Sequence, residues 1–203
     1  MALDSFAVMN VVGLLAFAVV GSLRAIDAEF DLLGVAVLGV MTALGGGVTR
    51  DLLVDSVPVA LRSTTDVSVA LLGVAVAVAL GHFGVADRTD HSLVLLPDAV
   101  GLAAFATTGA LVATSAGLSP FGVVVLATVT GVGGGLVSDL LLQNVPFVLV
   151  EDFYATCAIL GGVVFWLATT VGIGRRPSAL VCAAVVFVLR LLAIRYEWEL
   201  PTV

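Results

Sequence analysis

The chain has 203 residues, of which 61% are hydrophobic and only 11% are charged, and its mean hydropathy is +1.22. Soluble domains are about 45–50% apolar and about 25% charged, so this composition excludes a soluble globular protein. The net charge is −7 and all eight basic residues are arginine, which argues against a nucleic-acid partner, because phosphates require a basic patch. The composition instead predicts a multi-pass protein of the cell membrane.

Seven apolar segments follow one another along the chain, and each has roughly the 20 residues that cross a bilayer. The first segment lacks a basic amino-terminal region, so we predict a retained helix and not a signal peptide. The connections are short, which predicts a single all-α transmembrane domain over residues 1–203. The segments cover roughly residues 5–26, 32–56, 65–84, 96–116, 120–144, 153–173 and 178–196.

The first half of the chain recurs in the second half. Residues 12–61 align without a gap with residues 100–149 at a shift of 88 positions, with 24 identical pairs among 50. The match predicts a duplication, with repeat 1 over about 5–84, repeat 2 over about 96–173 and an extra helix at about 178–196. Because each repeat has three spans, the second enters the membrane inverted, an architecture known from transport proteins.

The second span of each repeat has three consecutive glycines, with an acid four residues after the last. Glycine costs roughly 1 kcal/mol per residue in a helix interior, so the triplets predict that the second and fifth helices are kinked or broken there. Freed carbonyls could then line a pore and coordinate alkali cations; alternatively, the glycines only permit close helix packing. The motif residues are Gly45, Gly46, Gly47, Arg50 and Asp51 in the first copy and Gly133, Gly134, Gly135, Ser138 and Asp139 in the second.

Three of these motif residues are charged, and ionisable groups inside a membrane span indicate a functional site. Arg50, Asp51 and Asp139 together have a net charge of −1, which favours a cation in the pore. Two alternatives remain: Arg50 and Asp139 form a structural pair between the repeats, or Asp51 lies close enough to the surface to be hydrated. Since Ser138 stands where the first copy has Arg50, a strictly symmetric site is not expected.

Other polar or conformationally special residues are predicted to have structural roles. Pro58 and Pro146 are expected to end the second and fifth spans. Asp98 is expected to be an acid at the amino end of the fourth helix, with a place at the pore mouth as the alternative. Cys157 and Cys182 are expected to be small core residues. No catalytic or nucleotide-binding motif is present, so we expect no enzyme, no cofactor and no metal beyond a transported monovalent cation.

The doubled motif resembles that of the prokaryotic trimeric intracellular cation (TRIC) channel family. The likeness rests on GGGxxRD at residues 45–51, GGGxxxD at residues 133–139, the proline after each motif and the seven-span repeat, and it covers about residues 5–195. It implies a homotrimer in membrane lipid with one pore per protomer that conducts potassium, sodium or other monovalent cations. It also implies kinks in the second and fifth helices and a pore lined by both glycine triplets, with Arg50, Asp51 and Asp139 at the motif's charged positions. Animal members use a lysine motif to bind a phosphoinositide, and this chain has no lysine, so that lipid gating is not expected.

The leading hypothesis from the sequence is therefore a passive, potassium-conducting channel. The alternative is a secondary transporter of a small amino acid such as glycine, because relatives of this domain are also named glycine transporters. A third possibility, a non-conducting scaffold, is disfavoured by the cost of the charges inside the membrane. Saturable uptake would indicate the carrier, and ohmic current would indicate the channel.

Overall fold

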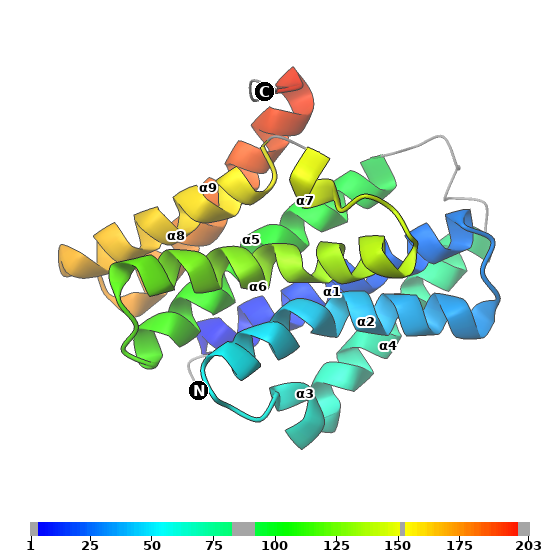
Figure 1. Cartoon of the computed structure of the whole chain (residues 1–203), viewed down its shortest axis with the longest axis horizontal. Coiled ribbons are helices and arrows are strands. Elements are labelled where there is room, and N and C mark those ends of the chain that lie inside the picture. Colours follow the sequence, from blue (N-terminus) through cyan, green and yellow to red (C-terminus); the bar gives the residue numbers. More distant parts are fainter. Residues whose placement is uncertain (1–3, 83–91, 151–152, 199–203) are drawn as a thin grey trace.

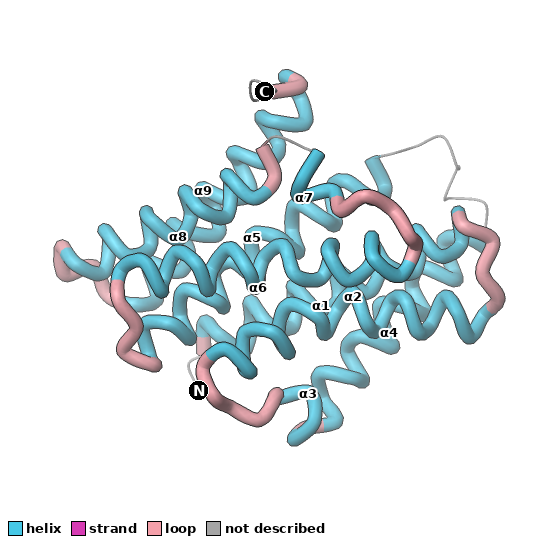
Figure 2. Tube along the Cα trace, viewed as in Figure 1, coloured by secondary structure: helices cyan, strands magenta, loops and turns pink. Residues whose placement is uncertain are grey.

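The computed structural model describes residues 4–82, 92–150 and 153–198, which form helices joined by loops without a strand (Figures 1 and 2). Six of the helices are long and apolar enough to cross a membrane, namely α1, α2, α4, α5, α6 and α9, and the apolar α8 is shorter at 16 residues. The predicted all-α membrane fold is confirmed. The helices in the described residues are α1 (Ser5–Asp27), α2 (Leu32–Leu53), α3 (Val59–Arg62), α4 (Thr64–His82), α5 (Ser92–Ser115), α6 (Pro120–Leu141), α7 (Phe147–Val150), α8 (Ala155–Thr170) and α9 (Arg175–Tyr196).

The helices α2 and α6 end earlier than the apolar pattern predicts. Shortly after each helix end a residue adopts a left-handed backbone conformation, Asp55 with φ 55° and Gln143 with φ 58°, which a right-handed helix cannot contain. Pro58 therefore does not end α2 but stands directly before α3, and Pro146 stands directly before α7. Our prediction that the prolines end the long helices is wrong. Residues 83 and 84, predicted to end the third segment, lie outside the described residues.

The glycine triplets do not interrupt their helices. The helical hydrogen bonding of α2 continues through residues 45–47, and that of α6 continues through residues 133–135. The prediction of a broken backbone is therefore wrong, and the carbonyls of the triplets remain within helices. A bend without a break stays a prediction.

The local structure of α2 and α6 is built alike. Asp31 begins α2 by accepting a hydrogen bond from the Gly34 N–H at 2.7 Å, and Ser119, 88 positions later, begins α6 by accepting one from the Gly122 N–H at 3.2 Å. Such caps supply partners to amide groups that have none inside the helix. Equivalent residues of the two sequence copies thus set where each helix starts.

The centre of the bundle is formed by α1, α2, α5 and α6, with α4 against α1 and α2 (Figure 1). On the other side α8 packs against α5 and α6, and α9 packs against α5 and α8. At this centre the rings of Phe17 and Phe105 meet edge to face, with their centroids 5.3 Å apart. Both side chains are fully buried, and the two residues are 88 positions apart. An aromatic pair of this geometry stabilises the contact by about 0.5–1.5 kcal/mol beyond its buried area. Equivalent residues of the two copies therefore pack against each other.

Candidate functional site

The site is centred on the crossing of α2 and α6, which lie side by side and run in opposite directions (Figure 1). Gly46 lies against the backbone carbonyl of Thr130, and Gly134 lies against the backbone carbonyl of Thr42. A Cβ atom at either glycine would overlap with main-chain oxygen, which cannot rotate away as a side chain can. These two glycines therefore allow the helices to approach, as in the small-residue contacts of membrane proteins.

The first glycine of each triplet belongs to the same crossing. A Cβ atom at Gly133 would lie 2.8 Å from the Cα of Gly46, and one at Gly45 would lie 2.8 Å from a methyl group of Val137. For the first two glycines of both triplets, the structure has the close packing that we considered as the alternative to a pore lining.

The third glycine of each triplet faces a polar side chain instead of the partner helix. The nearest atom to a Cβ at Gly47 would be Nη2 of Arg50, at 3.8 Å, and the nearest to a Cβ at Gly135 would be the hydroxyl of Tyr154, at 3.3 Å. Gly47 thus faces a polar cluster around Arg50, and Gly135 faces the hydroxyl of Tyr154. Because the helices are antiparallel, the polar groups that follow the two triplets lie toward opposite ends of the crossing.

The first cluster is built around Arg50 and Asp51, which are only 1% and 4% exposed. Nε and Nη2 of Arg50 both lie 2.8 Å from Oδ1 of Asp51, and Nη1 donates to Oγ1 of Thr108 at 3.3 Å. The guanidinium also lies over the ring of Phe6, 5.1 Å from its centroid. Two of our alternatives are thereby corrected: Arg50 pairs with its neighbour and not with Asp139, and Asp51 is buried and not hydrated at the surface.

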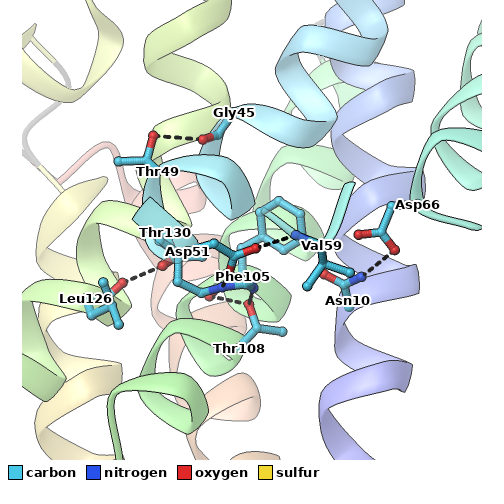
Figure 3. A network of polar contacts seen from close by, with 11 residues as sticks. Asn10, Gly45, Thr49, Asp51, Val59, Asp66, Phe105, Thr108, Leu126 and Thr130 are labelled. Atoms are coloured by element: carbon cyan, nitrogen blue, oxygen red, sulfur yellow. Dashed lines mark hydrogen bonds and ion pairs between the residues drawn. The ribbon is translucent and has the colours of Figure 1, made fainter. Parts of the chain in front are cut away.

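A second polar pair lies beside Arg50 and Asp51. Asn10 of α1 donates to Oδ1 of Asp66, in the first turn of α4, at 3.1 Å (Figure 3). These four residues and Gly47 border an enclosed space of about 10 Å³, close to the minimum that holds one water molecule. This end of the crossing is consequently almost closed in the structure.

The second cluster is built around Asp139, at the end of α6. Its Oδ1 forms a 2.8 Å ion pair with Nη1 of Arg24, and its Oδ2 accepts a hydrogen bond from the Phe147 N–H at 2.7 Å. Together with Asp27 and Asn144, these residues line an open vestibule of about 570 Å³. Arg24 lies in the last turn of α1 and is 115 positions from Asp139, so sequence reasoning did not bring the two together.

Asp51 and Asp139 have the same second role. Oδ2 of Asp51 accepts from the Val59 N–H at 2.9 Å, just as Oδ2 of Asp139 accepts from Phe147, 88 positions after Val59. Each carboxylate therefore holds the first residue of the short helix that follows its span. The two clusters differ in the residue that supplies the positive charge. Ser138 stands at the position equivalent to Arg50, and the ion-pair partner of Asp139 is instead Arg24 of α1. Ser138 itself is fully buried, and its hydroxyl has no hydrogen-bond partner among the described residues.

Asp98, Tyr154 and Arg190 form a further buried group that sequence reasoning missed. Asp98 is 3% exposed and accepts a 3.1 Å hydrogen bond from the hydroxyl of Tyr154, and the Arg190 guanidinium lies 4.9 Å from the centroid of that ring. Because α5 begins at Ser92, Asp98 lies inside the helix and not at its amino end, so our expectation for this residue is wrong. The sequence had no clear signal for this group: at the shift of 88, Asp98 corresponds to Asn10 and Tyr154 to Asp66, so neither position has the same residue in both copies. Only the structure shows that each of the two pairs is hydrogen-bonded.

The residues that the structure describes include no group of histidine, cysteine and acidic side chains that could hold a metal ion. Cys157 and Cys182 are both buried and unpaired.

Replacing Thr108 with valine is expected to lower the free energy of unfolding by about 1 kcal/mol, because Arg50 loses a buried hydrogen-bond acceptor. Valine fits in shape, since the equivalent position of the first copy is the buried Val20. The measurement is thermal unfolding of the detergent-solubilised protein. Thr114→Val is the matched control, because the hydroxyl of Thr114 bonds only the Ala110 carbonyl of its own helix. Equal effects of the two changes would contradict a stabilising role of the Thr108 contact.

The comparison with known proteins also divides the chain into two similar parts. A family model described as "Glycine transporter" matches residues 7–82 and again residues 95–170. A UPF0126 membrane protein of Deinococcus radiodurans is 44% identical over 162 residues, which are 78% of this chain and 74% of that protein. The UPF0126 membrane protein YvgT of Bacillus subtilis is 37% identical over 200 residues, which are 95% of this chain and 94% of that protein.

Solved structures of similar chains are also known. A TRIC cation channel is similar with a TM-score of 0.87 at 36% identity, and the match covers 98% of this chain and 97% of that one. The TRIC trimeric intracellular cation channel orthologue from Rhodobacter sphaeroides is similar with a TM-score of 0.86 at 30% identity, with 95% and 98% covered.

Proposed function

The chain belongs to the prokaryotic TRIC channel family, and from this membership we propose that it is a cation channel that conducts potassium and other monovalent cations through a pore in each protomer. It is accordingly a multi-pass membrane protein and not an enzyme. Its assembly as a homotrimer in membrane lipid is part of the proposal and is supported by the TRIC orthologue, which is described as trimeric.

The observation that carries the proposal is the placement of Asp51 and Asp139. The two carboxylates lie toward opposite ends of the antiparallel α2–α6 crossing, and each is only 4% exposed. Acidic side chains at both approaches to a narrow crossing favour cations and repel anions, as charged rings do in other cation channels. Buried acids at membrane depth are costly, which favours a functional role over a structural one.

The pathway that we propose passes between α2 and α6. In the closed arrangement the first two glycines of each triplet hold the helices in contact, and conduction requires the helices to bend at the triplets and separate. The lining then comprises Gly45, Gly46, Gly47, Gly133, Gly134 and Gly135, with Arg50, Asp51, Ser138 and Asp139 at its two ends. Pro58 and Pro146 support it by starting the short helices that Asp51 and Asp139 hold.

An inverted pair of repeats, over about 5–84 and 96–173, is the organisation that we propose for this pathway, with the extra helix at about 178–196. The Phe17–Phe105 contact, the paired glycine contacts and the two equivalent carboxylate bonds support it. The aromatic contact joins two residues that are 88 positions apart, and each paired glycine contact and carboxylate bond of one half recurs in the other half at a shift of 88 positions.

A secondary transporter of a small amino acid such as glycine is the alternative, because the matching family model has the name "Glycine transporter". The vestibule of about 570 Å³ is large enough for such a solute. However, Arg24, which would bind the carboxylate of an amino acid, is already paired with Asp139.

Recording of the purified protein in a planar bilayer under a potassium chloride gradient tests the proposal. We expect unitary currents that reverse near the equilibrium potential of potassium. Each end of the crossing has a net negative charge, because Asp66 adds to the Arg50–Asp51 pair and Asp27 adds to the Arg24–Asp139 pair. Reversal near the chloride potential would contradict cation conduction. Saturable glycine uptake into vesicles by a sample without current would replace the channel with the carrier.

A further inference from the structure

Asp98 has a buried carboxylate oxygen that accepts no hydrogen bond from the described residues. The side chain is 3% exposed; Oδ1 accepts from Tyr154, while Oδ2 has no hydrogen-bond partner among the described residues. Burial of a carboxylate oxygen without a donor is costly, so buried polar atoms in folded proteins are almost always satisfied by protein, water or an ion. Asp98 lies in α5, outside both glycine motifs, and the motif-based pathway does not use it.

The position of Asp98 is directly behind the wall of the vestibule. Phe147, which lines the vestibule, packs its ring edge to face against Tyr154 with centroids 5.3 Å apart, and Tyr154 is hydrogen-bonded to Asp98. The charge of Asp98 also interacts with those of Arg24 and Asp139, both of which line the vestibule. Phe147 and Tyr154 therefore connect Asp98 to the wall of the open space.

The two arginines near Asp98 are held by other groups. Arg24 forms its ion pair with Oδ1 of Asp139, and the guanidinium of Arg190 lies over the rings of Phe147 and Tyr154, at 5.3 and 4.9 Å from their centroids. The charges of both arginines interact with that of Asp98, but neither arginine donates a hydrogen bond to Oδ2, which stays without a donor among the described residues.

The equivalent position in the other half of the chain also borders a polar space. Asn10 and Asp66, 88 positions before Asp98 and Tyr154, form a hydrogen bond and line the enclosed space beside Asp51. In both halves, therefore, a hydrogen-bonded pair with one acid lies next to the acid of the motif. This second observation does not depend on the missing partner of Oδ2.

We infer that Asp98 is a cation-coordinating residue of the conduction pathway, whose Oδ2 binds a partly dehydrated potassium or sodium ion between the vestibule and the α2–α6 crossing. The inference rests on the proposed cation channel and adds to it a site outside the glycine motifs. Carboxylate oxygen is a hard ligand suited to an alkali cation. Tyr154 is a positioning residue, because it binds Oδ1 and leaves Oδ2 for the ion.

The test is the concentration dependence of the unitary potassium current of full-length protein with Asp98→Asn. Asparagine fits this place in shape, since the equivalent residue is Asn10. We expect the half-saturating potassium concentration to rise roughly threefold, which corresponds to a loss of about 0.65 kcal/mol in ion binding. The current at saturating potassium should remain close to that of the wild type. An unchanged half-saturating concentration in folded protein would overturn the inference.

Asp4→Asn is the matched control for the loss of one negative charge. Asp4 is exposed and caps α1, and asparagine caps helices about as well as aspartate. It should leave the half-saturating concentration unchanged; an equal rise in this control would overturn a specific role of Asp98.

Tyr154→Phe separates the charge from the hydrogen bond, because it keeps Asp98 and removes only the contact to Oδ1. If it reproduced the full effect of Asp98→Asn, the hydrogen bond and not ion binding would explain that effect.

Asp98→Glu keeps the inference testable if Asp98→Asn does not fold. Glutamate retains the charge and moves the carboxylate by one methylene, so the sodium-to-potassium permeability ratio should change. An unchanged ratio would overturn the inference. Failure of the proposed function itself would be recognised by a different observation, since wild-type protein would then pass no cation current at any concentration.

Discussion

Gly46→Ala is expected to lower the free energy of unfolding by about 3 kcal/mol, at the upper end of the usual cost of overpacking. The added Cβ atom would overlap with the Thr130 carbonyl, and a backbone atom in the middle of α6 can move only if the two helices separate. Thermal unfolding of the detergent-solubilised protein measures the effect. Gly134→Ala should have a similar effect, because the equivalent contact is with the carbonyl of Thr42.

Gly47→Ala is the control for this prediction, since it makes the same change one residue later in the same helix. The nearest atom to its Cβ would be 3.8 Å away, an ordinary contact, and alanine favours a helix interior over glycine by roughly 1 kcal/mol. Its stability should therefore equal or exceed that of the wild type. If Gly46→Ala were tolerated as well as Gly47→Ala, the α2–α6 contact would not depend on glycine at this position.

Asp139→Asn is expected to reduce the potassium conductance more than tenfold at low salt and to shift the reversal potential toward that of chloride. The substitution leaves Arg24 at the vestibule without its acid, and a positive charge there repels cations. Two unit charges about 4 Å apart interact by roughly 4 kcal/mol at an effective dielectric constant of 20, and about 1.4 kcal/mol is already a tenfold effect. Unitary currents under a potassium chloride gradient, at low and high salt, measure the change, which should be smaller at high salt because of screening.

The double variant Arg24→Gln with Asp139→Asn provides the decisive comparison. It restores the net charge of the wild-type vestibule wall, because the loss of Arg24 offsets the loss of Asp139 while Asp27 remains. It should therefore recover most of the conductance that Asp139→Asn loses, and the difference measures the coupling of the pair. Arg24→Gln alone should not reduce cation conductance, because it leaves the acid in place. If the double variant conducted no better than Asp139→Asn, the 2.8 Å ion pair would have no part in conduction.

The main features of the fold were predictable because they depend on local pattern. Apolar segments of bilayer length predicted the long helices, and the composition predicted a membrane protein. The chain was also correctly identified as a member of the TRIC family from its doubled glycine motif.

The glycine triplets illustrate where local reasoning failed. Helix propensity alone predicted a kink or a break at residues 45–47. The break is absent because propensity does not include the stabilisation that close packing of α2 on α6 provides, and the kink stays a prediction. Likewise, one of the alternatives from the sequence was a structural pair between Arg50 and Asp139. The antiparallel crossing instead places them toward opposite ends, where Arg50 pairs with Asp51 and Asp139 with Arg24.

By itself, the sequence determined that this protein is a helical membrane protein of the TRIC family with two similar halves and an acid after each glycine triplet. Only the tertiary structure decided which charges pair, that Gly46 and Gly134 are packing contacts and that Asp98 is buried behind the vestibule. The physical reason is the distance along the chain over which each signal acts. Hydropathy and motif spacing depend on residues within one segment. The ion pair of Arg24 and Asp139 instead joins residues 115 positions apart, and only the packing of their helices brings Nη1 and Oδ1 to 2.8 Å from each other.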